Sequence, residues 1–144
     1  MSFSENRKAR HDYEILDTFD AGIVLDGHEV KSIRAGHANL TGSYVVFRNG
    51  ELWVIGLKIP KYEKAGPLPG YDDARTRKVL MRKREIMSLF GKIQQKGLTL
   101  VPISLYAHGR HVKLRFGLGR GKKAHDKRET LKRRDIDREL RSRE

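Results

Sequence analysis

The segment 117–123 holds the residues whose types and spacing come nearest to a chemical motif. It reads Gly117-x-Gly119-x-Gly121-Lys122-Lys123, which resembles part of a phosphate-binding loop. The Walker pattern would need glycine at position 116 and Ser or Thr at position 123, but the chain has Phe116 and Lys123 there. We therefore do not predict nucleotide hydrolysis. The segment indicates a backbone that can approach a phosphate closely, followed by cations.

Histidines are the other candidates for chemistry, and the chain has six of them, widely scattered. His108 and His111 flank an expected turn, but no third ligand accompanies them, so we predict no metal site. His11 and Asp12 have the residue types for acid–base chemistry in a ribonuclease, but no second histidine with a positioned partner is evident. The sequence therefore predicts no catalytic residue and no cofactor.

The charge of the chain favours a polyanionic partner. There are 31 Lys and Arg against 18 Asp and Glu, a net charge of +13. Residues 119–144 hold 11 of the basic and 6 of the acidic residues, a surplus of +5, so +8 remains on residues 1–118. A basic excess spread over body and tail indicates nucleic acid as the partner. Without cysteines, a long apolar run or a signal-peptide core, we expect a soluble cytoplasmic protein.

Four groups of basic residues are candidates for phosphate contacts. They are Arg7, Lys8, Arg10 and His11; Lys31 and Arg34; the segment 75–84; and Lys113 with Arg115. Such contacts give salt-sensitive affinity without sequence information, which suits recognition of a folded RNA by its shape. Few aromatic residues are available as a stacking platform for single strands. The segment 1–11 is either a solvated arm or a phosphate clamp.

Short alternating segments predict the strands that would position these cations. Residues 13–25 alternate with Asp20 on the outward face, and Gly22 is expected to mark a bend or bulge. Residues 43–48 and 51–59 flank Asn49-Gly50, a strong hairpin signal, with Trp53, Ile55, Leu57 and Ile59 expected on one face. A last hairpin joins 98–106 to 111–118.

Two helices are expected between the strands. One lies within 27–36, and the other carries Ile86, Leu89, Phe90 and Ile93 as a stripe expected to pack on the sheet, ending at Gly97. The segment 60–74 reads as a long loop. We predict a mainly β (α+β) fold, an OB-fold-like small antiparallel barrel with inserted helices in residues 1–120, although a flat sheet would give the same strands. Residues 121–144 are expected to be a basic tail, disordered alone.

Several motifs taken in order resemble one bacterial family, small protein B, also called the SsrA-binding protein. They are Asn6-Arg7-Lys8-Ala9-Arg10-His11-Asp12-Tyr13, Gly27-x-Glu29-Val30-Lys31-Ser32-Ile33-Arg34-Ala35-Gly36, Asn39-Leu40, Lys96-Gly97-Leu98-Thr99-Leu100-Val101-Pro102 and Gly121-Lys122-Lys123-x-x-Asp126-Lys127-Arg128. The resemblance covers nearly the whole chain. It implies an OB-fold-like barrel that binds transfer-messenger RNA, and a partner role in trans-translation, the rescue of stalled ribosomes.

The resemblance also implies roles for particular residues. In the family, the barrel binds the tRNA-like part of the RNA with positions that correspond here to Asp20, Leu80, Arg82 and Lys113. The tail is similar to the part that enters the small-subunit decoding region of the ribosome and becomes helical there. Its corresponding residues are Gly121, Lys122, Lys123, His125, Asp126, Lys127 and Arg128.

Three positions depart from the family pattern. Asp20 stands where Glu is expected, Arg82 where His or Asn is expected, and Gly42 where Asp is usual. We expect a monomeric, non-enzymatic RNA-binding adaptor. The alternatives are a structural ribosomal protein with a permanently threaded tail and, further removed, a small ribonuclease.

Overall fold

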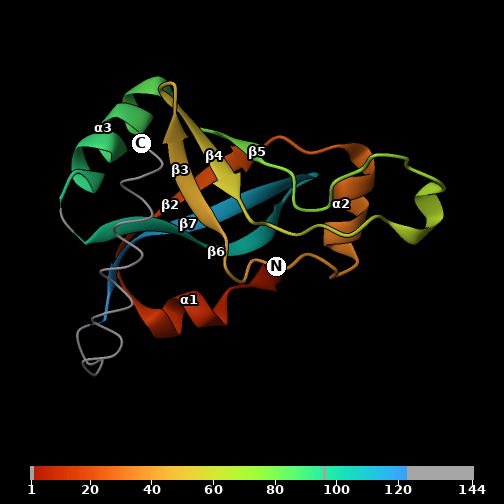
Figure 1. The fold of residues 1–144 in the computed structure, drawn as a ribbon, viewed down its shortest axis with the longest axis horizontal. Helices are drawn as coiled ribbons and strands as arrows, with labels where there is room; N and C mark the ends of the chain where they lie inside the picture. Colours follow the sequence, from red (N-terminus) through yellow and green to blue (C-terminus); the bar gives the residue numbers. More distant parts are fainter. Residues whose placement is uncertain (1, 96, 123–144) are drawn as a thin grey trace.

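Antiparallel strands wrapped into a barrel make up most of the computed structural model, which describes residues 2–95 and 97–122 (Figure 1). Within these residues the strands are β1 (Ser2–Glu5), β2 (Tyr13–Ile23), β3 (Tyr44–Arg48), β4 (Glu51–Ile55), β5 (Arg77–Leu80), β6 (Leu98–His108) and β7 (His111–Gly121). The helices are α1 (Arg7–Asp12), α2 (Gly27–Arg34) and α3 (Lys83–Ile93), with a 3-10 turn, η1, at Glu63–Ala65.

The sheet closes on itself, which confirms the predicted barrel. Its strand order is β1-β6-β3-β4-β5-β2-β7, and β7 returns to pair with β6. The long strand β6 serves three partners: β7 along one edge, and on the other edge β3 at Leu100 and β1 at Ser104–Tyr106. Leu114 and Phe116 of β7 are fully buried in the core, as their alternation predicts, and Leu100 of β6 is fully buried beside them.

The N-terminal segment is folded from Ser2 onward, so of the two alternatives for this segment the solvated arm is wrong. Asn6 is buried, and its side-chain amide donates to the carbonyl oxygens of Leu40 and Pro102 at 3.2 and 2.9 Å. The Asn6 side-chain oxygen accepts from the backbone N–H of Ala9 at 3.1 Å and so caps α1. One buried amide therefore ties β1 and α1 to two distant parts of the chain.

The hairpin at Asn49-Gly50 is confirmed, with φ of 54° and 76° at the two turn residues. The expected phase of β4 is wrong, because Leu52 and Val54 are buried while Trp53 and Ile55 are only half-buried. Gly56, with φ of 77°, ends the strand and resets the alternation. Leu57 and Ile59 are therefore buried although they share odd numbers with Trp53.

Gly22 does not mark the bulge that the sequence predicts for β2, and Gly117 of β7 is closely packed. The irregularity in β2 lies between Ile15 and Asp17, and Gly22 is paired on both sides. Gly117 lies inside β7, where an added Cβ would come within 2.9 Å of side-chain carbons of Ile15 and Ile103. Gly117 thus serves barrel packing, and β7 continues to Gly121, three residues beyond its predicted end.

Helix α3 covers one end of the barrel beside β3 and β4, away from α2 and the long loop (Figure 1). The helix ends at Ile93, before the predicted stop at Gly97. Its stripe packs only in part on the sheet. Leu89 is buried, but Phe90 is 51 % exposed and touches Phe47 edge-on at a centroid distance of 5.4 Å.

Candidate RNA interface

A shallow hollow of about 360 Å³ brings together the four residues to which the sequence resemblance assigns barrel contacts with RNA. Asp20, Leu80, Arg82 and Lys113 line it, and Ala21, Gly22, Met81 and Glu85 complete its wall. These residues come from β2, β5, the start of α3 and β7. A single concave surface therefore presents a carboxylate, an apolar side chain and two cations.

Strand pairing at Gly22 explains why these distant residues meet. Gly22 is in register with Leu80 of β5 on one side and with Lys113 of β7 on the other. A Cβ at Gly22 would lie 3.2 Å from the Cβ of Leu80, so the bare glycine lets Leu80 pack across β2. The Leu80 side chain stays 49 % exposed, and Arg82 follows at the N-terminus of α3.

The carboxylate of Asp20 is held by two neighbours on adjacent strands. The Tyr106 hydroxyl donates to Asp20 Oδ1 at 2.8 Å, and Nε of Arg115 donates to the same oxygen at 3.0 Å. The Arg115 guanidinium lies 5.1 Å from the centroid of the Tyr106 ring. Its hydrogen bond to Asp20 raises the pKa of Arg115, and burial together with the bond to Asp20 raises the pKa of Tyr106.

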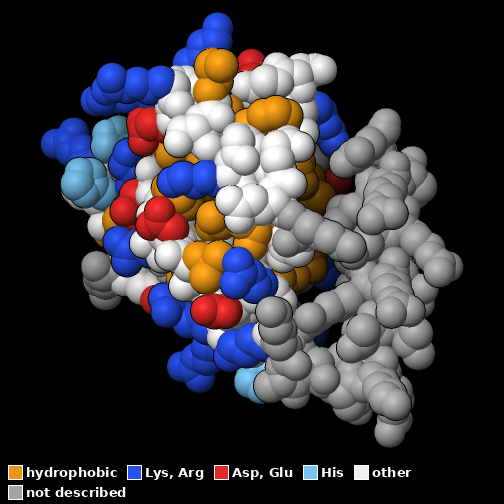
Figure 2. All heavy atoms as spheres, turned by 90° about the vertical axis from the view of Figure 1, so that its left-hand side faces the viewer, with side chains coloured by type: hydrophobic (Ala, Val, Ile, Leu, Met, Phe, Trp, Pro, Cys, Tyr) orange, Lys and Arg blue, Asp and Glu red, His pale blue; other side chains and the backbone are white. Residues whose placement is uncertain are grey.

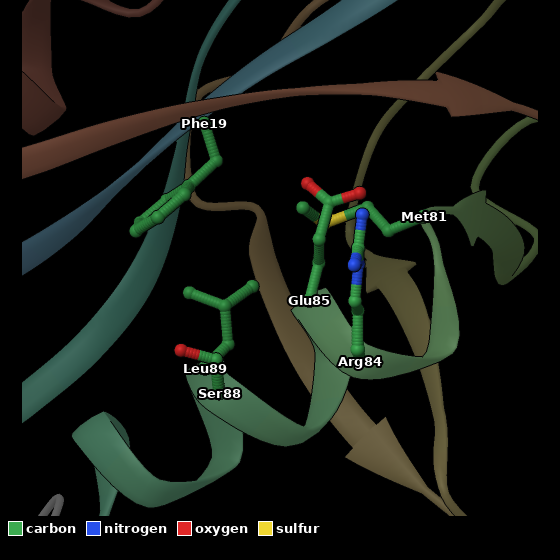
Figure 3. Close-up of a pocket in the computed structure, with 6 residues that line it drawn as sticks. All are labelled: Phe19, Met81, Arg84, Glu85, Ser88 and Leu89. Carbon is green, nitrogen blue, oxygen red and sulfur yellow. The ribbon is translucent and has the colours of Figure 1, made fainter.

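A second hollow of about 310 Å³ continues from the first, since the two share Met81 and Glu85. Figure 3 shows Phe19 pointing from β2 toward Leu89 of α3, with Arg84 and Glu85 rising from the start of the helix. Lys92 Nζ lies 5.5 Å from the centroid of the Phe19 ring. On the face drawn in Figure 2, Lys and Arg side chains are spread around apolar ones.

The basic segment 75–84 divides into two parts, so its interpretation as one solvent-facing patch is wrong. Arg77 is fully buried, and its Nη2 and Nε donate to Glu29 Oε2 at 2.6 and 2.8 Å. Arg75 pairs with the same carboxylate, and Tyr71 donates to it at 3.0 Å. Of its basic residues, Arg75 and Lys78 are half-buried, and Arg82, Lys83 and Arg84 are exposed.

Glu29 is the centre of this buried cluster, a role that our sequence analysis does not predict. Burial opposes ionisation of its carboxylate, but hydrogen bonds from Arg75, from the backbone of Asp26 and from Arg77 outweigh it and lower the pKa to about 2. The cluster fixes α2 to β5 and to the loop that carries Tyr71. The sequence signal that points to Glu29 is its position in the first turn of α2, three residues after Asp26, which is the spacing of a capping box. Glu29 Oε1 accepts a hydrogen bond from the backbone N–H of Asp26 at 2.9 Å.

The cations of α1 form a separate group at the other end of β2. Arg7, Lys8, Arg10 and His11 are exposed, and only Ala9 of the helix is buried. Tyr13 is seven residues before Asp20, so at the usual strand rise the two ends are roughly 23 Å apart. Lys122 donates its backbone N–H to the carbonyl of Asp12 at 3.2 Å, so α1 lies where β7 ends.

The α2 cations lie on yet another side of the barrel (Figure 1). Lys31 is exposed, while Nη2 of Arg34 donates to the carbonyl of Arg110 at 3.0 Å and the guanidinium lies 5.4 Å from the Phe3 ring centroid. Gly121 and Lys122 mark the end of β7. Lys123, His125, Asp126, Lys127 and Arg128 lie outside the described residues.

Other kinds of site find no support in residues 2–95 and 97–122. No group of three His, Asp or Glu residues is placed there to hold a metal ion. His108 and His111 face each other across the turn between β6 and β7. None of the helices described is long and apolar enough to cross a membrane.

Known proteins resemble this chain over almost its full length. The model of the SmpB protein family matches residues 3–144. The SsrA-binding protein of Microcystis aeruginosa is 55 % identical over 95 % of this chain and 89 % of its own, and that of Carboxydothermus hydrogenoformans is 52 % identical over 95 % and 91 %. A solved structure described as "tmRNA-SmpB: a journey to the center of the bacterial ribosome" superposes with a TM-score of 0.71 at 52 % identity, covering 86 % of this chain and 87 % of that one. The chain therefore belongs to the SmpB protein family.

Proposed function

We propose that this protein is a non-enzymatic adaptor that binds the tRNA-like domain of transfer-messenger RNA and delivers it to stalled ribosomes in trans-translation. Two findings support this function: its relatives are named SsrA-binding proteins, and the solved structure that holds a similar chain is described as tmRNA-SmpB. The observation that carries the proposal is the convergence of Asp20, Leu80, Arg82 and Lys113 in one hollow. This surface is the barrel's RNA interface.

The chemistry of the hollow suits a folded RNA. Lys113 and Arg82 supply positive charge for phosphates, and their spacing is fixed by the rigid pairing of β2 with β5 and β7. The exposed Leu80 offers an apolar surface on which an unpaired base can rest. A carboxylate repels phosphates, so Asp20 faces hydrogen-bond donors of the RNA, such as amino groups or 2′-hydroxyls.

The other cations make a second, independent contribution. The second group is Arg7, Lys8, Arg10 and His11 of α1, the helix whose last residue, Asp12, accepts the backbone hydrogen bond of Lys122 at the end of β7. The tail beyond it enters the decoding region of the small subunit, with Gly121, Lys122, Lys123, His125, Asp126, Lys127 and Arg128 as its contact residues. Lys31, Arg34 and Arg115 add further positive charge around the barrel. The protein acts as a cytoplasmic monomer.

Sequencing of the RNA that co-purifies with the protein tests the partner. A single small stable RNA with a tRNA-like end is the expected result, and recovery of ribosomal RNA alone would favour a structural ribosomal protein. The site is tested by titrating the isolated tRNA-like RNA with Lys113→Ala and with Lys61→Ala, which removes an exposed lysine of the long loop outside the hollow. Only Lys113→Ala should weaken binding, and equal effects would contradict the assignment of the hollow.

A further inference from the structure

The two oxygens of the Asp20 carboxylate have different surroundings. Oδ1 accepts two hydrogen bonds, from the Tyr106 hydroxyl at 2.8 Å and from Arg115 Nε at 3.0 Å. Oδ2 accepts none from the residues that the structure describes, and the side chain is half-exposed beside the hollow. Since a carboxylate oxygen offers about two lone-pair sites, Oδ1 is occupied within the protein, whereas Oδ2 keeps both of its sites as far as residues 2–95 and 97–122 are concerned.

This arrangement is built into the barrel. Asp20 and Arg115 are opposite each other in the β2–β7 register, and Tyr106 is opposite Lys113 in the β6–β7 register. Three neighbouring strands thus present their side chains on one outer face. The Tyr106 ring also lies against the Arg115 guanidinium, so each donor restrains the other.

We propose that Tyr106 and Arg115 are positioning residues that orient Asp20 so that Oδ2 alone accepts a hydrogen bond from the RNA. This inference rests on the proposed function and specifies how its interface discriminates. The recognised group is a single donor, either a 2′-hydroxyl or an exocyclic amino group of an unpaired base. The paired N1–H and N2–H donors of a guanine edge would require both carboxylate oxygens, and Oδ1 is already occupied.

Tyr106→Phe is the decisive variant, because it removes the donor and keeps the ring that touches Arg115. We expect it to weaken binding of the tRNA-like RNA about fivefold, the usual scale of one hydrogen bond. In an Asp20→Ala background, which weakens binding by itself, the same change should have no further effect. Tyr62→Phe, on the long loop away from the hollow, is the matched control and should leave binding unchanged.

The double-mutant cycle separates positioning from other roles. An equal loss from Tyr106→Phe in both backgrounds would mean that the hydroxyl acts independently of Asp20, and would overturn the proposal. Because no charge is lost, the dependence of binding on salt should be the same for wild type and Tyr106→Phe. Arg115→Ala should likewise be coupled to Asp20, but should also reduce the salt dependence. Thermal unfolding of each variant identifies any loss that comes from the fold.

Modified RNAs identify the donor. Single 2′-deoxy substitutions and bases lacking their amino group are scanned through the unpaired loops of the tRNA-like RNA. One substitution should weaken binding by wild type but not by Asp20→Ala, and its type distinguishes the 2′-hydroxyl from the amino group. Asp20-dependent losses from both N1-methylation and amino-group removal on one guanine would show bidentate recognition and overturn the proposal. If wild type fails to bind any tRNA-like RNA, the proposed function itself fails.

Discussion

Single residues in this barrel have surroundings that their types alone do not reveal. Glu29 and Arg77 are fully buried ions, although the sequence places both among ordinary charged residues. Removing one partner of such a pair leaves an uncompensated charge in the interior, which is costly. Burial and pairing thus remove part of the segment 75–84 from any RNA contact and make it part of the core.

Glu29→Gln should destabilise the protein in a pH-dependent way. The pKa of Glu29 is lowered from 4.5 to about 2, so the unfolded chain binds more protons between these values. The contribution of the ionised carboxylate is fully present above pH 4.5 and is lost as the pH falls through about 2. A shift of this size corresponds to about 3 kcal/mol at neutral pH.

Urea unfolding at several pH values measures this effect. The difference between wild type and Glu29→Gln should shrink as the pH falls from about 4.5 toward 2. Glu63→Gln, in the exposed turn η1, is the control and should have little effect at any pH. A difference that stays constant across the acid range would contradict the role assigned to the ionised Glu29.

At the scale of elements, the hairpin β3–β4 depends on its two turn residues. Asn49 and Gly50 both have positive φ, which costs most residues about 1–2 kcal/mol. Changing both to Ala should lower the free energy of unfolding by about 1–3 kcal/mol, as denaturant titration would show. RNA binding should be unaffected at low temperature, since neither residue lines the hollow.

Gly91 supplies the control for this hairpin variant. It lies in α3 without positive φ, and an added Cβ would meet nothing within 4 Å. Gly91→Ala should therefore stabilise the protein by about 0.5–1 kcal/mol, the usual cost of glycine in a helix. Equal effects of the alanine changes at the turn and at Gly91 would contradict the role of positive φ in the turn.

Local patterns predicted most of the elements, and long-range pairing explains the rest. The Asn49-Gly50 turn and the alternation in β7 are local signals, and both hold. The fold of β1 and α1 depends on hydrogen bonds from Asn6 to Leu40 and Pro102, and no local sequence signal predicts these bonds. The phase of β4 depends on Gly56, because its positive φ interrupts the alternation of apolar residues that the sequence shows from Trp53 to Ile59.

The candidate site also has residues that local patterns predict and residues that depend on long-range pairing. Asp20 facing outward follows from alternation along β2, and its exposure agrees. Alternation says nothing about Leu80, which came from the family resemblance, because its place depends on Gly22 pairing with two strands. No local pattern points to Tyr106, since its bond to Asp20 joins residues 86 positions apart.

At the scale of the whole molecule, positive charge is distributed over several separate regions of the barrel. Binding of the tRNA-like RNA should therefore weaken steeply with salt. Each phosphate contact adds a slope of about −0.7 to −0.9 in log K against log salt. Titrations between low and moderate salt should give a slope several times that of a single phosphate contact. Lys113→Ala should reduce the slope by about the contribution of one contact. A slope near zero would contradict an electrostatic interface.

The barrel should fold without the C-terminal segment. Gly121 is paired with Tyr13, and Lys122 bonds to Asp12, so the cut belongs after Lys122. We expect residues 1–122 to unfold cooperatively, with a circular dichroism spectrum typical of β-structure, and to bind the tRNA-like RNA, though less tightly. An unfolded fragment would contradict the division between barrel and tail. A shorter fragment that ends at Gly117 should be unfolded, because this truncation removes part of the β7 pairing with both β2 and β6.

We expect changes at Asp126, Lys127 and Arg128 to separate the two activities proposed for the protein. They follow the last strand and lie outside the described residues, on a segment with few apolar residues. Changing all three to Ala should abolish rescue of stalled ribosomes and leave binding of the tRNA-like RNA nearly intact. The physical reason is that so many charges and so few apolar residues favour order only beside a partner of opposite charge, and under the proposed function we expect the ribosomal RNA to be that partner.

Both activities are measured on the same purified variant, as RNA affinity and as peptide tagging on stalled ribosomes. The matched control changes Arg141, Ser142 and Arg143 to Ala near the chain end, which removes two cations and should leave most tagging intact. Equal losses of RNA affinity and tagging in the Asp126–Lys127–Arg128 variant would contradict the division of labour between barrel and tail. Unchanged tagging would contradict the role of Asp126, Lys127 and Arg128. A solvated charge cluster can be removed without loss of tagging, whereas removal of residues that contact an empty message channel should reduce it.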